Sequence, residues 1–597
     1  MSGFTTRPEI RGSFGMVTST HWIASAVGFG ILEQGGNAFD AAVAAGLVLQ
    51  VVEPHLNGPA GDLPVIFHDA TTDRTQVLCA QGTAPAAATI EVFEQLGLEL
   101  IPGSGLLPGV VPGAFDGWMQ LLRDHGTMEL GQVMTPAITY ARDGHPMLAG
   151  VSKAIEGVAP FMAEEWPTSA AVWTPGGEVP TPGELFRNPD LAATYQRLVD
   201  EATGDTREGR IDAARDLWRR GFVVDAIEDY LATAEVADVT GSRNRALLTR
   251  ADIEGWEAHY EAPVEIDYHG YTICKTGPWG QGPVLLQGLR ILENFDLAAM
   301  DPMGADFVHL VVEAMKLAYA DREAYYGDPD FTDIPLETLL SRDYARDRAA
   351  LIDMKTASTD QRPGRIPGFE HWADAAIARA ARDFKAGTGA SVGEPTMAHL
   401  TERKGDTVHL DIIDQWGNMV SATPSGGWLQ SAPVVPGLGF PLNTRAQMFW
   451  LEDGLPSSLA PGRRPRTTLT PSLVKKDGKP WLVMGTPGGD QQDQWQLIWF
   501  LRLVHHGLDI QEGIDAPLFH SQHFQGSFYP RKANPGAMMI EPAIGDDVIA
   551  DLRGRGHTVT VSAPWSVGRL TAAIRDEDGL LRAGATPRLM QAYAVGR

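Results

Sequence analysis

Cysteines, long apolar runs and basic runs are scarce in this sequence, and each scarcity excludes a class of protein. Cys79 and Cys274 are the only cysteines and lie far apart in the chain. Neither a disulfide framework nor a cysteine-ligated zinc site is therefore indicated, and we expect both to be core or strand residues. No segment reaches the roughly 18 uninterrupted apolar residues of a membrane span. The longest candidate, residues 41–52, is expected to be a buried helix.

The charge balance is strongly acidic, with a formal net charge of -27 and no basic run. A polyanion would be repelled, so nucleic acid and anionic membrane are not expected as partners. Local positive charge can still recruit a small anion, which leaves Arg445 and the Arg463–Arg464 pair as candidates. Residues 1–20 carry polar and charged side chains where a signal peptide needs a continuous apolar region, so we expect a cytoplasmic protein.

The remaining composition is that of a globular protein, with 44% hydrophobic and 21% charged residues. A chain of 597 residues allows about four domains, or one large layered unit. Apolar periodicity predicts helices over 18–52 (broken at 35–37), 115–150, 190–234, 309–322, 372–384 and 494–505. Strands are predicted at 64–67 and 481–484, and 160–190 is predicted to be rich in loops.

One helix carries a pair that invites a metal interpretation. His309 and Glu313 are one turn apart on the predicted helix 309–322. No further cluster in the sequence completes a metal site, so a satisfied pair on the helix is favoured. We expect no metal and no cofactor.

A β-hairpin near residue 410 is the most informative local pattern. Apolar residues alternate at Val408, Leu410 and Ile412, which is the period of a half-buried strand, and 415–418 form a turn. If residue 413 lies opposite 419, the register places residue 407 opposite 425. Ser425 would then lie beside Thr407.

Thr407, at the head of that strand, can be interpreted as a nucleophile. A threonine hydroxyl is weak until a base takes its proton, and the residue's own α-amino group can act as that base once the chain is cut before it. Residues 353–406 are polar and marked by Pro and Gly, which suits a mobile tether ahead of a cleavage point. An ordinary strand threonine after a simple linker is the alternative.

The second chemical element is a turn between a strand and a helix, Gly485 to Asp490, which contains Gly488 and Gly489. Two glycines there present backbone N–H groups without side chains in the way. Such an arrangement suits an oxyanion hole at a helix N-terminus, although many turns of this kind are only turns.

Several motifs occur together in one order: GGNAFDAAVAAGLVLQVVEPH, GTAPAAAT, LPGVVPGAFDGW, HLVVEAMKLAYADREAYYGDP, DTVHLDIIDQWGNMVSAT, LAPGRRPRTTLTPSL, GTPGGD and GATPR. In these motifs the chain resembles the gamma-glutamyltranspeptidase family of N-terminal nucleophile hydrolases. The resemblance covers most of 18–595, and is loose at 150–250 and 353–400.

The resemblance implies an α+β fold, a four-layer αββα sandwich made as one precursor that cuts itself between Asp406 and Thr407. Cleavage would give a large subunit, 1–406, and a small catalytic subunit, 407–597, which assemble with each other. A higher (αβ)2 oligomer is left open. Ser425 aligns with the family's hydroxyl partner of the nucleophile. Gly488 and Gly489 align with its oxyanion-hole glycines.

Substrate recognition departs from the family pattern. The arginine that holds the glutamyl α-carboxylate is replaced by Gln81, and an asparagine after the return strand is replaced by Gly427. The acidic residues that bind the glutamyl ammonium become Gln447 and Met448. Losing such charge-assisted contacts removes roughly 1.5–3 kcal/mol each.

Three other residues of that region can still contact a substrate. Two serines of the glutamyl site become Thr467 and Thr468, which can hydrogen-bond a carboxylate. Arg445 could pair with an anion from another direction, or form a salt bridge at the surface or between chains.

The expected function is therefore a self-processing acyl hydrolase acting on a small, carboxylate-bearing substrate other than glutathione. The family's less typical branches include oxamate and cephalosporin-side-chain amidases, and homologues in natural-product pathways that hydrolyse a carbon–carbon bond next to a ketone. True gamma-glutamyl transfer or glutathione hydrolysis is the first alternative. An idle binding protein of the same fold is the second.

Overall fold

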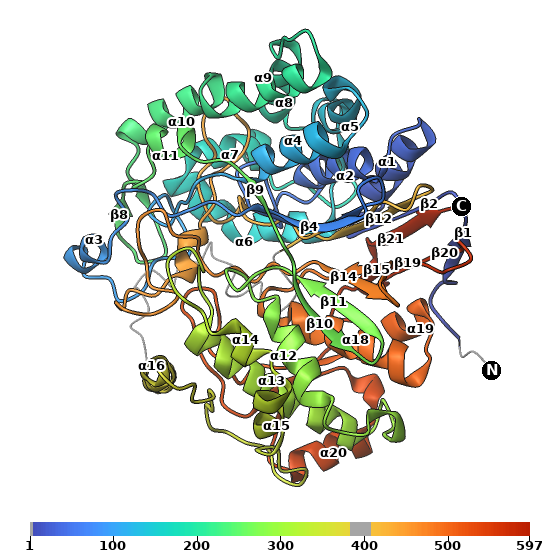
Figure 1. Cartoon of the computed structure of the whole chain (residues 1–597). Helices are drawn as coiled ribbons and strands as arrows, with labels where there is room; N and C mark the ends of the chain where they lie inside the picture. Colours follow the sequence, from blue (N-terminus) through green and yellow to red (C-terminus); the bar gives the residue numbers. More distant parts are fainter. Residues whose placement is uncertain (1–3, 383–406) are drawn as a thin grey trace.

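Two antiparallel sheets of seven strands each form the centre of the computed structural model, which describes residues 4–382 and 407–597 (Figure 1). Sheet I has the order β1 (Ile10–Gly12), β20 (Leu581–Ala585), β19 (Thr571–Arg575), β15 (Lys479–Gly485), β14 (Ser472–Lys476), β11 (Tyr271–Lys275), β10 (Val264–Tyr268). Sheet II has the order β21 (Tyr593–Gly596), β2 (Gly15–Ser19), β12 (Leu410–Asp414), β13 (Met419–Ala422), β3 (Leu63–Asp69), β4 (Arg74–Ala80), β9 (His259–Glu261).

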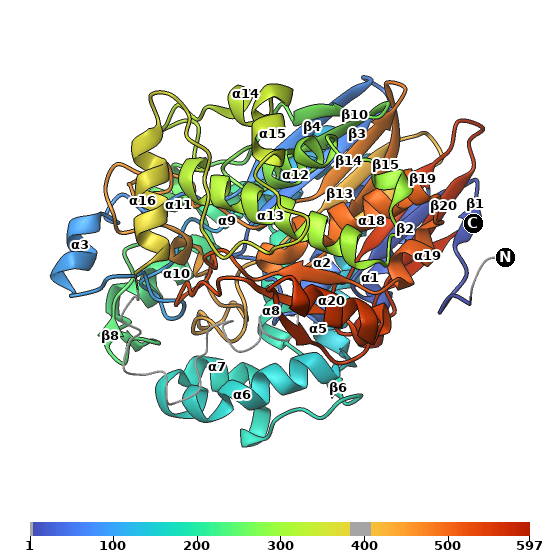
Figure 2. The same cartoon turned by 90° about the horizontal axis from the view of Figure 1, so that it is seen from below.

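Helices cover the outer face of each sheet, so the layers run helix, sheet, sheet, helix (Figure 1). Those over sheet II are α1 (Trp22–Glu33), α2 (Ala38–Val52), α4 (Ala114–His125), α5 (Leu130–Asp143), α6 (Ala149–Glu165), α7 (Pro167–Trp173), α8 (Pro189–Asp200), α9 (Arg207–Arg219) and α10 (Phe222–Thr233). Those over sheet I include α12 (Pro283–Leu292), α13 (Ala305–Tyr325) and α18 (Gln492–His506), which lie in front of its strands in Figure 2. The αββα sandwich expected from the sequence is confirmed.

Peripheral elements complete the chain. Short strands pair as β5 (His145–Pro146) with β6 (Leu185–Phe186), β7 (Val236–Ala237) with β8 (Arg243–Asn244), and β16 (Phe519–Ser521) with β17 (Ala537–Ile540) and β18 (Thr558–Val561). The outer helices are α3 (Ile90–Gln95), α11 (Arg250–Glu254), α14 (Leu336–Leu339), α15 (Arg342–Ala349), α16 (Glu370–Ala380), α19 (Ile510–Asp515) and α20 (Asp546–Gly554).

An apolar layer joins the inner faces of the two sheets. Met16, Ile413 and Met419 of sheet II meet Leu473 and Val483 of sheet I there, all buried. The two cysteines belong to the same layer and are free thiols on β4 and β11. Their interpretation as strand residues of the core is confirmed.

Helix α2 illustrates how local signals set the layers. Asn37 caps it, accepting N–H bonds from Phe39 and Asp40, while the Asp40 carboxylate accepts the Asn37 N–H. Every residue of α2 is buried, as expected for 41–52. No helix in the part of the chain that the structure describes is long and apolar enough to cross a membrane.

Some sequence predictions need correction. Residues 18 and 19 belong to strand β2 and not to the first helix, because they pair with β12 in the middle of sheet II. Much of 160–190, predicted to be loop, is helical in α6 and α7, where Pro167 occupies the first position of α7, the place a helix tolerates it. The predicted helix 372–384 is α16, Glu370–Ala380. Of the predicted tether, 383–406 lies outside the described residues.

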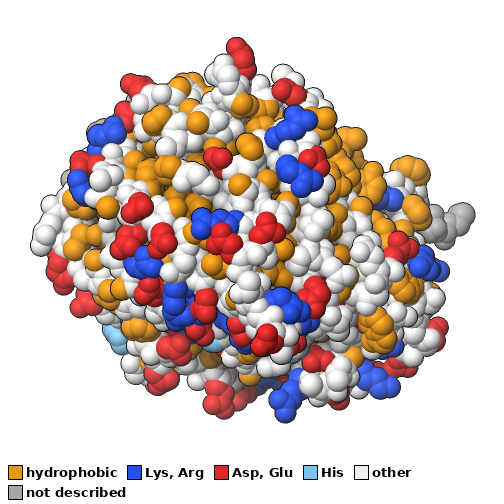
Figure 3. Space-filling view, turned by 90° about the horizontal axis from the view of Figure 1, so that it is seen from above, with side chains coloured by type: hydrophobic (Ala, Val, Ile, Leu, Met, Phe, Trp, Pro, Cys, Tyr) orange, Lys and Arg blue, Asp and Glu red, His pale blue; other side chains and the backbone are white. Residues whose placement is uncertain are grey.

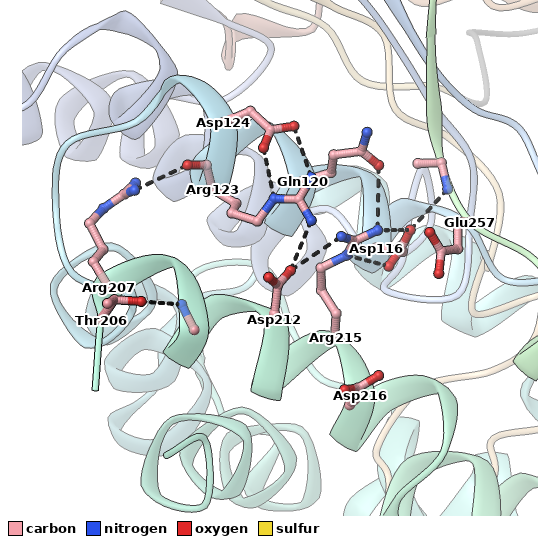
Figure 4. A network of polar contacts seen from close by, with 12 residues as sticks. Asp116, Gln120, Arg123, Asp124, Thr206, Arg207, Asp212, Arg215, Asp216 and Glu257 are labelled. Carbon is pink, nitrogen blue, oxygen red and sulfur yellow. Dashed lines mark hydrogen bonds and ion pairs between the residues drawn. The ribbon is translucent and has the colours of Figure 1, made fainter. Parts of the chain in front are cut away.

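A buried ion pair fastens α4 to α9 above sheet II (Figure 4). The Arg215 guanidinium donates to both carboxylate oxygens of Asp116, at 2.7 and 3.0 Å. The Ala258 N–H donates to the same carboxylate at 2.9 Å, and Arg219 approaches it at 3.8 Å. The side chains of Asp116 and Arg215 are 1% and 5% exposed. One carboxylate therefore holds together three segments that are distant in the sequence.

The outer face of this helical layer is highly charged but mixed in sign. In Figure 3, acidic and basic side chains are interspersed with apolar ones across the face seen from above. Arg250, for example, contacts both Asp225 and Glu228. Such exposed pairs contribute little stability each, so the buried pair is the better test of what holds the layer.

We predict that Asp116→Asn, which keeps the shape of the side chain but leaves the buried Arg215 only its longer ionic contact with the exposed Asp212 at 3.4 Å, lowers the free energy of unfolding by about 3–5 kcal/mol. The matched control is Arg220→Ala, which removes an exposed pair with Asp216 and should cost no more than about 1 kcal/mol. Urea unfolding followed by circular dichroism measures both. Equal midpoints for the two variants would contradict the role given to the buried pair.

Candidate active site

Thr407 and Ser425 lie side by side where the β12–β13 hairpin opens. The ladder pairs Leu410 with Ala422 and Ile413 with Met419, and it continues into an isolated bridge between residues 407 and 425. The Thr407 hydroxyl donates to Ser425 Oγ at 3.2 Å, and both residues are buried. The register deduced from the sequence is confirmed. The catalytic roles of the two residues stay predictions, and Asp406 lies outside the described residues.

A buried polar network follows Thr407 along the same face of β12. His409 contacts Thr423 Oγ1 and Asp411 Oδ1, each at 2.9 Å. Asp411 also accepts from Ser421 at 2.9 Å, and from Thr571 of sheet I at 2.8 Å. This network joins the two sheets directly behind Thr407. The sequence analysis assigned no role to His409 or Asp411, although their alternation with Val408, Leu410 and Ile412 was the available signal.

The loop of residues 57–62 closes against the return strand. Ser425 and Asp62 exchange backbone hydrogen bonds, with N–H to O distances of 3.1 and 2.7 Å. A Cβ on Gly61 would lie 2.1 Å from the Ser425 carbonyl oxygen, so only glycine permits this approach. The large and small segments of the chain thus meet at the hydroxyl pair.

The Gly485–Asp490 turn leaves sheet I at the end of β15 and enters α18 through a short 3-10 turn, Gly489–Gln491. Gly488 and Gly489 have φ of 138° and 56°, backbone conformations that favour glycine. Ser421, on β13, donates to the Met484 carbonyl at 3.2 Å, which ties this strand to the Thr407 hairpin. The first N–H groups of a helix have no partner within it, and the oxyanion role of the two glycines stays a prediction.

Arg445 is buried inside the chain and not at a surface or between chains. Its Nε donates to Asp62, its guanidinium lies 4.9 Å from the centre of the Trp428 ring, and Nη2 has no hydrogen-bond partner. A Cβ on Gly426 would lie 3.4 Å from that Nη2. Burial raises the pKa of the Asp62 carboxyl, and the Arg445 guanidinium opposes that shift. The Nε group of Arg445 is therefore engaged by Asp62, whereas its Nη2 group remains unpaired beside the return strand.

Gln447 and Met448 follow Arg445 in a 3-10 turn. The Gln447 amide nitrogen donates to the Thr444 carbonyl at 3.0 Å, and its oxygen accepts the Tyr529 N–H at 3.1 Å. Both polar atoms of the side chain are therefore bonded to the backbone. Met448 packs with Trp428 and Phe528 in a small apolar cluster. At these two positions the geometry supplies no charged partner for an ammonium group.

The other predicted substrate-binding residues lie together beside residues 465–468. The Gln81 amide donates to the Pro465 carbonyl at 3.3 Å, and its Oε1 has no partner. Thr467 donates its N–H to the Trp279 carbonyl at 3.0 Å. The Thr468 hydroxyl is buried without a hydrogen-bond partner. Buried polar atoms without a partner, such as Gln81 Oε1 and Thr468 Oγ1, are what a site for a polar ligand would supply.

Two candidates from the sequence are satisfied within the fold. Arg464 is held by Asp328, at 2.7 Å, and by Asp330, at 2.8 Å. His309 contacts His557 Nε2 at 2.8 Å and the Asp353 carbonyl at 2.9 Å. Although His309, Glu313 and His557 are close enough to hold a metal ion, hydrogen bonds occupy both nitrogens of His309. Glu313 is held by Lys316 at 2.6 Å and by Arg362 at 3.0 Å. His309 and Glu313 are thus each satisfied within the fold, but by other residues and not as the pair expected from the sequence.

Comparisons with known proteins agree with this architecture. The model of the gamma-glutamyltranspeptidase family matches residues 24–596. The glutathione hydrolase-like YwrD proenzyme of Bacillus subtilis (strain 168) is 30% identical over 97% of this chain and 98% of its own. The Acylase ACY 1 proenzyme of Pseudomonas sp. (strain SE83) is 31% identical over 96% and 92%.

Among solved structures, that of LmbA2991HD is 52% identical and covers 100% of both chains with a TM-score of 0.91. The family match extends over almost the whole chain, and it includes the hairpin, the Gly-Gly turn and the residues around Arg445. The chain therefore belongs to the gamma-glutamyltranspeptidase family, and it is an enzyme of the N-terminal nucleophile hydrolase type.

Proposed function

We propose that the protein is a self-processing threonine hydrolase that cleaves an acyl bond of a small, carboxylate-bearing substrate other than glutathione. The observation that carries the proposal is the buried pair of hydroxyls, Thr407 and Ser425, 3.2 Å apart at the open end of β12 and β13. A weak nucleophile needs a proton acceptor within hydrogen-bond reach. The position of Thr407 after a predicted cleavage point would supply one as a free α-amino group.

The proposed reaction has two stages. Thr407 Oγ attacks the substrate carbonyl while its proton passes to the new α-amino group, with Ser425 orienting the hydroxyl. The N–H groups of Gly488 and Gly489 stabilise the oxyanion of the tetrahedral intermediate. The leaving group departs with the transferred proton, and water then hydrolyses the acyl-threonine to release the acid. Amide cleavage and cleavage of an activated carbon–carbon bond differ only in that leaving group.

The choice of substrate class rests on the recognition residues. Gln81 and Met448 stand where the family pattern has charged groups, and the amide of Gln447 is engaged by the protein at both ends. An α-ammonium and an α-carboxylate desolvated without partners cost several kcal/mol. Two of the relatives are named acylases, which is in line with a substrate other than glutathione.

We predict that Thr407→Ala protein remains a single chain of 64.5 kDa. The wild type should separate into fragments of about 44 and 21 kDa, in proportion to 406 and 191 of the 597 residues. Denaturing electrophoresis after purification measures this, and Thr407→Ser, which keeps a hydroxyl, serves as control. If the alanine variant is still cut before residue 407, another protease is responsible and self-processing is wrong.

Ser425→Ala is expected to slow both processing and turnover by about 10²-fold, the usual effect of losing a positioned proton-transfer group. Ser425→Thr, which restores a hydroxyl at the same place, should recover part of both rates. The measurement is the rate of fragment appearance together with steady-state turnover. Unchanged rates in Ser425→Ala would remove this residue from the mechanism.

True gamma-glutamyl transfer is the second candidate, supported by the relative named as glutathione hydrolase-like. We predict that kcat/KM for gamma-glutamyl-p-nitroanilide is at least about 10³-fold below the value of roughly 10⁴ M⁻¹s⁻¹ that an ordinary enzyme reaches. A glutathione hydrolase assayed in parallel is the positive control. Brisk, saturable release of p-nitroaniline by the processed protein, unaffected by Arg445→Ala, would favour the second candidate instead.

A further inference from the structure

Four arginines are buried together beside the Gly-Gly turn: Arg322, Arg379, Arg466 and Arg531, each at most 1% exposed. They surround two buried carboxylates, Glu323 and Asp490, whose pKa values are lowered by these guanidinium groups against the opposing effect of burial. Four positive charges thus face two negative ones. Glu452, the next carboxylate, lies at the rim, with its side chain 33% exposed and 3.9 Å from Arg379.

Arg322 pairs with both carboxylates, and Arg466 Nη2 also lies 3.1 Å from Glu323 Oε1. Arg322 donates to Asp490 Oδ1 at 2.5 Å, to Glu323 Oε1 at 2.8 Å and to the Gln281 Oε1 at 2.8 Å. Its guanidinium also lies over the Tyr319 ring, 4.5 Å from the centre. Arg322 is therefore a structural residue with its donors satisfied, and the unpaired donors belong to the other three arginines, of which Arg466 shares Glu323 as a counter-charge.

Arg466 and Arg531 both donate hydrogen bonds to one loop, at the adjacent residues Ser527 and Gly526. Arg466 Nη2 donates to Ser527 Oγ at 3.1 Å, and Arg531 Nε donates to the adjacent Gly526 carbonyl at 3.3 Å. Arg531 also stacks on Trp450, with its guanidinium carbon 3.5 Å from the ring centre. These contacts fix the planes of both guanidinium groups before any ligand binds.

Each of these groups has an N–H that the fold leaves unpaired. Arg466 Nη1, Arg531 Nη2, and both Nε and Nη1 of Arg379 are buried with no hydrogen-bond partner. Burial lowers the pKa of Arg466 to about 10 and that of Arg531 well below its ordinary value. A buried donor without a partner costs about 1–3 kcal/mol, and more when it is charged. An anion would satisfy several of these donors together.

The cluster adjoins the site already described. Arg466 directly precedes Thr467 and Thr468, and Asp490 directly follows Gly489. Asp490 accepts hydrogen bonds from both the N–H and the hydroxyl of Ser527, at 2.9 and 2.6 Å, so the loop that carries Arg531 is attached to the Gly-Gly turn.

A second series of contacts connects the same loop to Ser425. Phe528 packs on Trp428, whose ring faces the Arg445 guanidinium. Arg445 pairs with Asp62, which in turn bridges to Ser425. These contacts link the loop that carries Arg531 to the strand that holds Ser425, beside Thr407.

We propose that Arg466 and Arg531 form a binding site for a carboxylate of the substrate, remote from the carbonyl that is attacked, so that preferred substrates are acyl derivatives of small dicarboxylic acids. Planar, pre-oriented guanidinium groups suit a carboxylate because they can donate two parallel hydrogen bonds. That the bound carboxylate belongs to a substrate rests on the proposed function. Binding of an anion at these arginines does not depend on it.

The first experiment measures binding to the processed wild-type enzyme by calorimetry. The probes are oxalate, succinate and glutarate, each compared with its neutral diamide. At least one dianion should bind about ten-fold or more tightly than its diamide, since hydrogen bonds to charged groups are the stronger class. If no dianion binds more tightly than its diamide, the proposal is overturned without recourse to any variant.

Variants locate the site. Arg466→Gln and Arg531→Gln should each weaken the preferred dianion about ten-fold or more, and Arg466→Lys should recover part of the loss. Arg346→Gln, which removes an exposed arginine paired with Asp343, is the charge-matched control and should change nothing. If a glutamine variant fails to fold, Arg531→Lys, which keeps the charge but loses the planar pair of donors, replaces it. Dianion affinity unchanged in these variants would contradict the assignment.

A second readout separates this site from the proposed chemistry. Succinyl- and glutaryl-p-nitroanilide should be hydrolysed with lower KM than butyryl-p-nitroanilide, and Arg466→Gln should raise KM more than it lowers kcat. Dianion binding without release from any anilide would contradict the acyl chemistry and leave the site standing. Release that is equal for the charged and uncharged anilides, and unaffected by Arg466→Gln, would contradict the site alone.

Discussion

The antiparallel pairing of β12 with β13 is the interaction on which the rest of the site depends. Its register places Thr407 opposite Ser425, and a slip of one residue would turn both side chains to the other face of the sheet. The pairing is over-determined, because β12 is flanked by β2 and β13 by β3 in the middle of sheet II. Behind it, His409 and Asp411 link the hairpin to sheet I through Thr571. Thr407 therefore stands on one of the most constrained segments of the molecule.

The charge of the whole protein is negative, whereas buried arginines make the interior near the site locally positive. The chain has a net charge of -27, yet Arg445, Arg466 and Arg531 are buried around the residues that the family pattern assigns to the reaction. Desolvated arginines attract an anion far more strongly than exposed ones, because the surrounding medium screens them less. The net charge of the whole protein therefore does not exclude an anionic substrate at a site of buried arginines.

The sequence predicted the elements with strong local signals and missed those that depend on distant contacts. The alternation at Val408, Leu410 and Ile412 was sufficient to derive the register, because a period of two leaves one solution once the turn is placed. Residues 18 and 19 were assigned to a helix because their strand character comes from pairing with β12, nearly 400 positions away. The partner of Arg445 was missed for the same reason, since Asp62 lies in a different part of the chain. The four buried arginines come from α13, α16 and two loops, so no local sequence pattern predicts that they lie together.

The most direct test of the central claim is intact-mass spectrometry of the processed enzyme, quenched early during turnover of the p-nitroanilide that it hydrolyses fastest. The account predicts that the fragment beginning at Thr407 gains the mass of the acyl group, that peptide mapping places the group on Thr407, and that the adduct disappears when substrate is exhausted. An adduct on another residue, or a burst of p-nitroaniline with no adduct on that fragment, would contradict it.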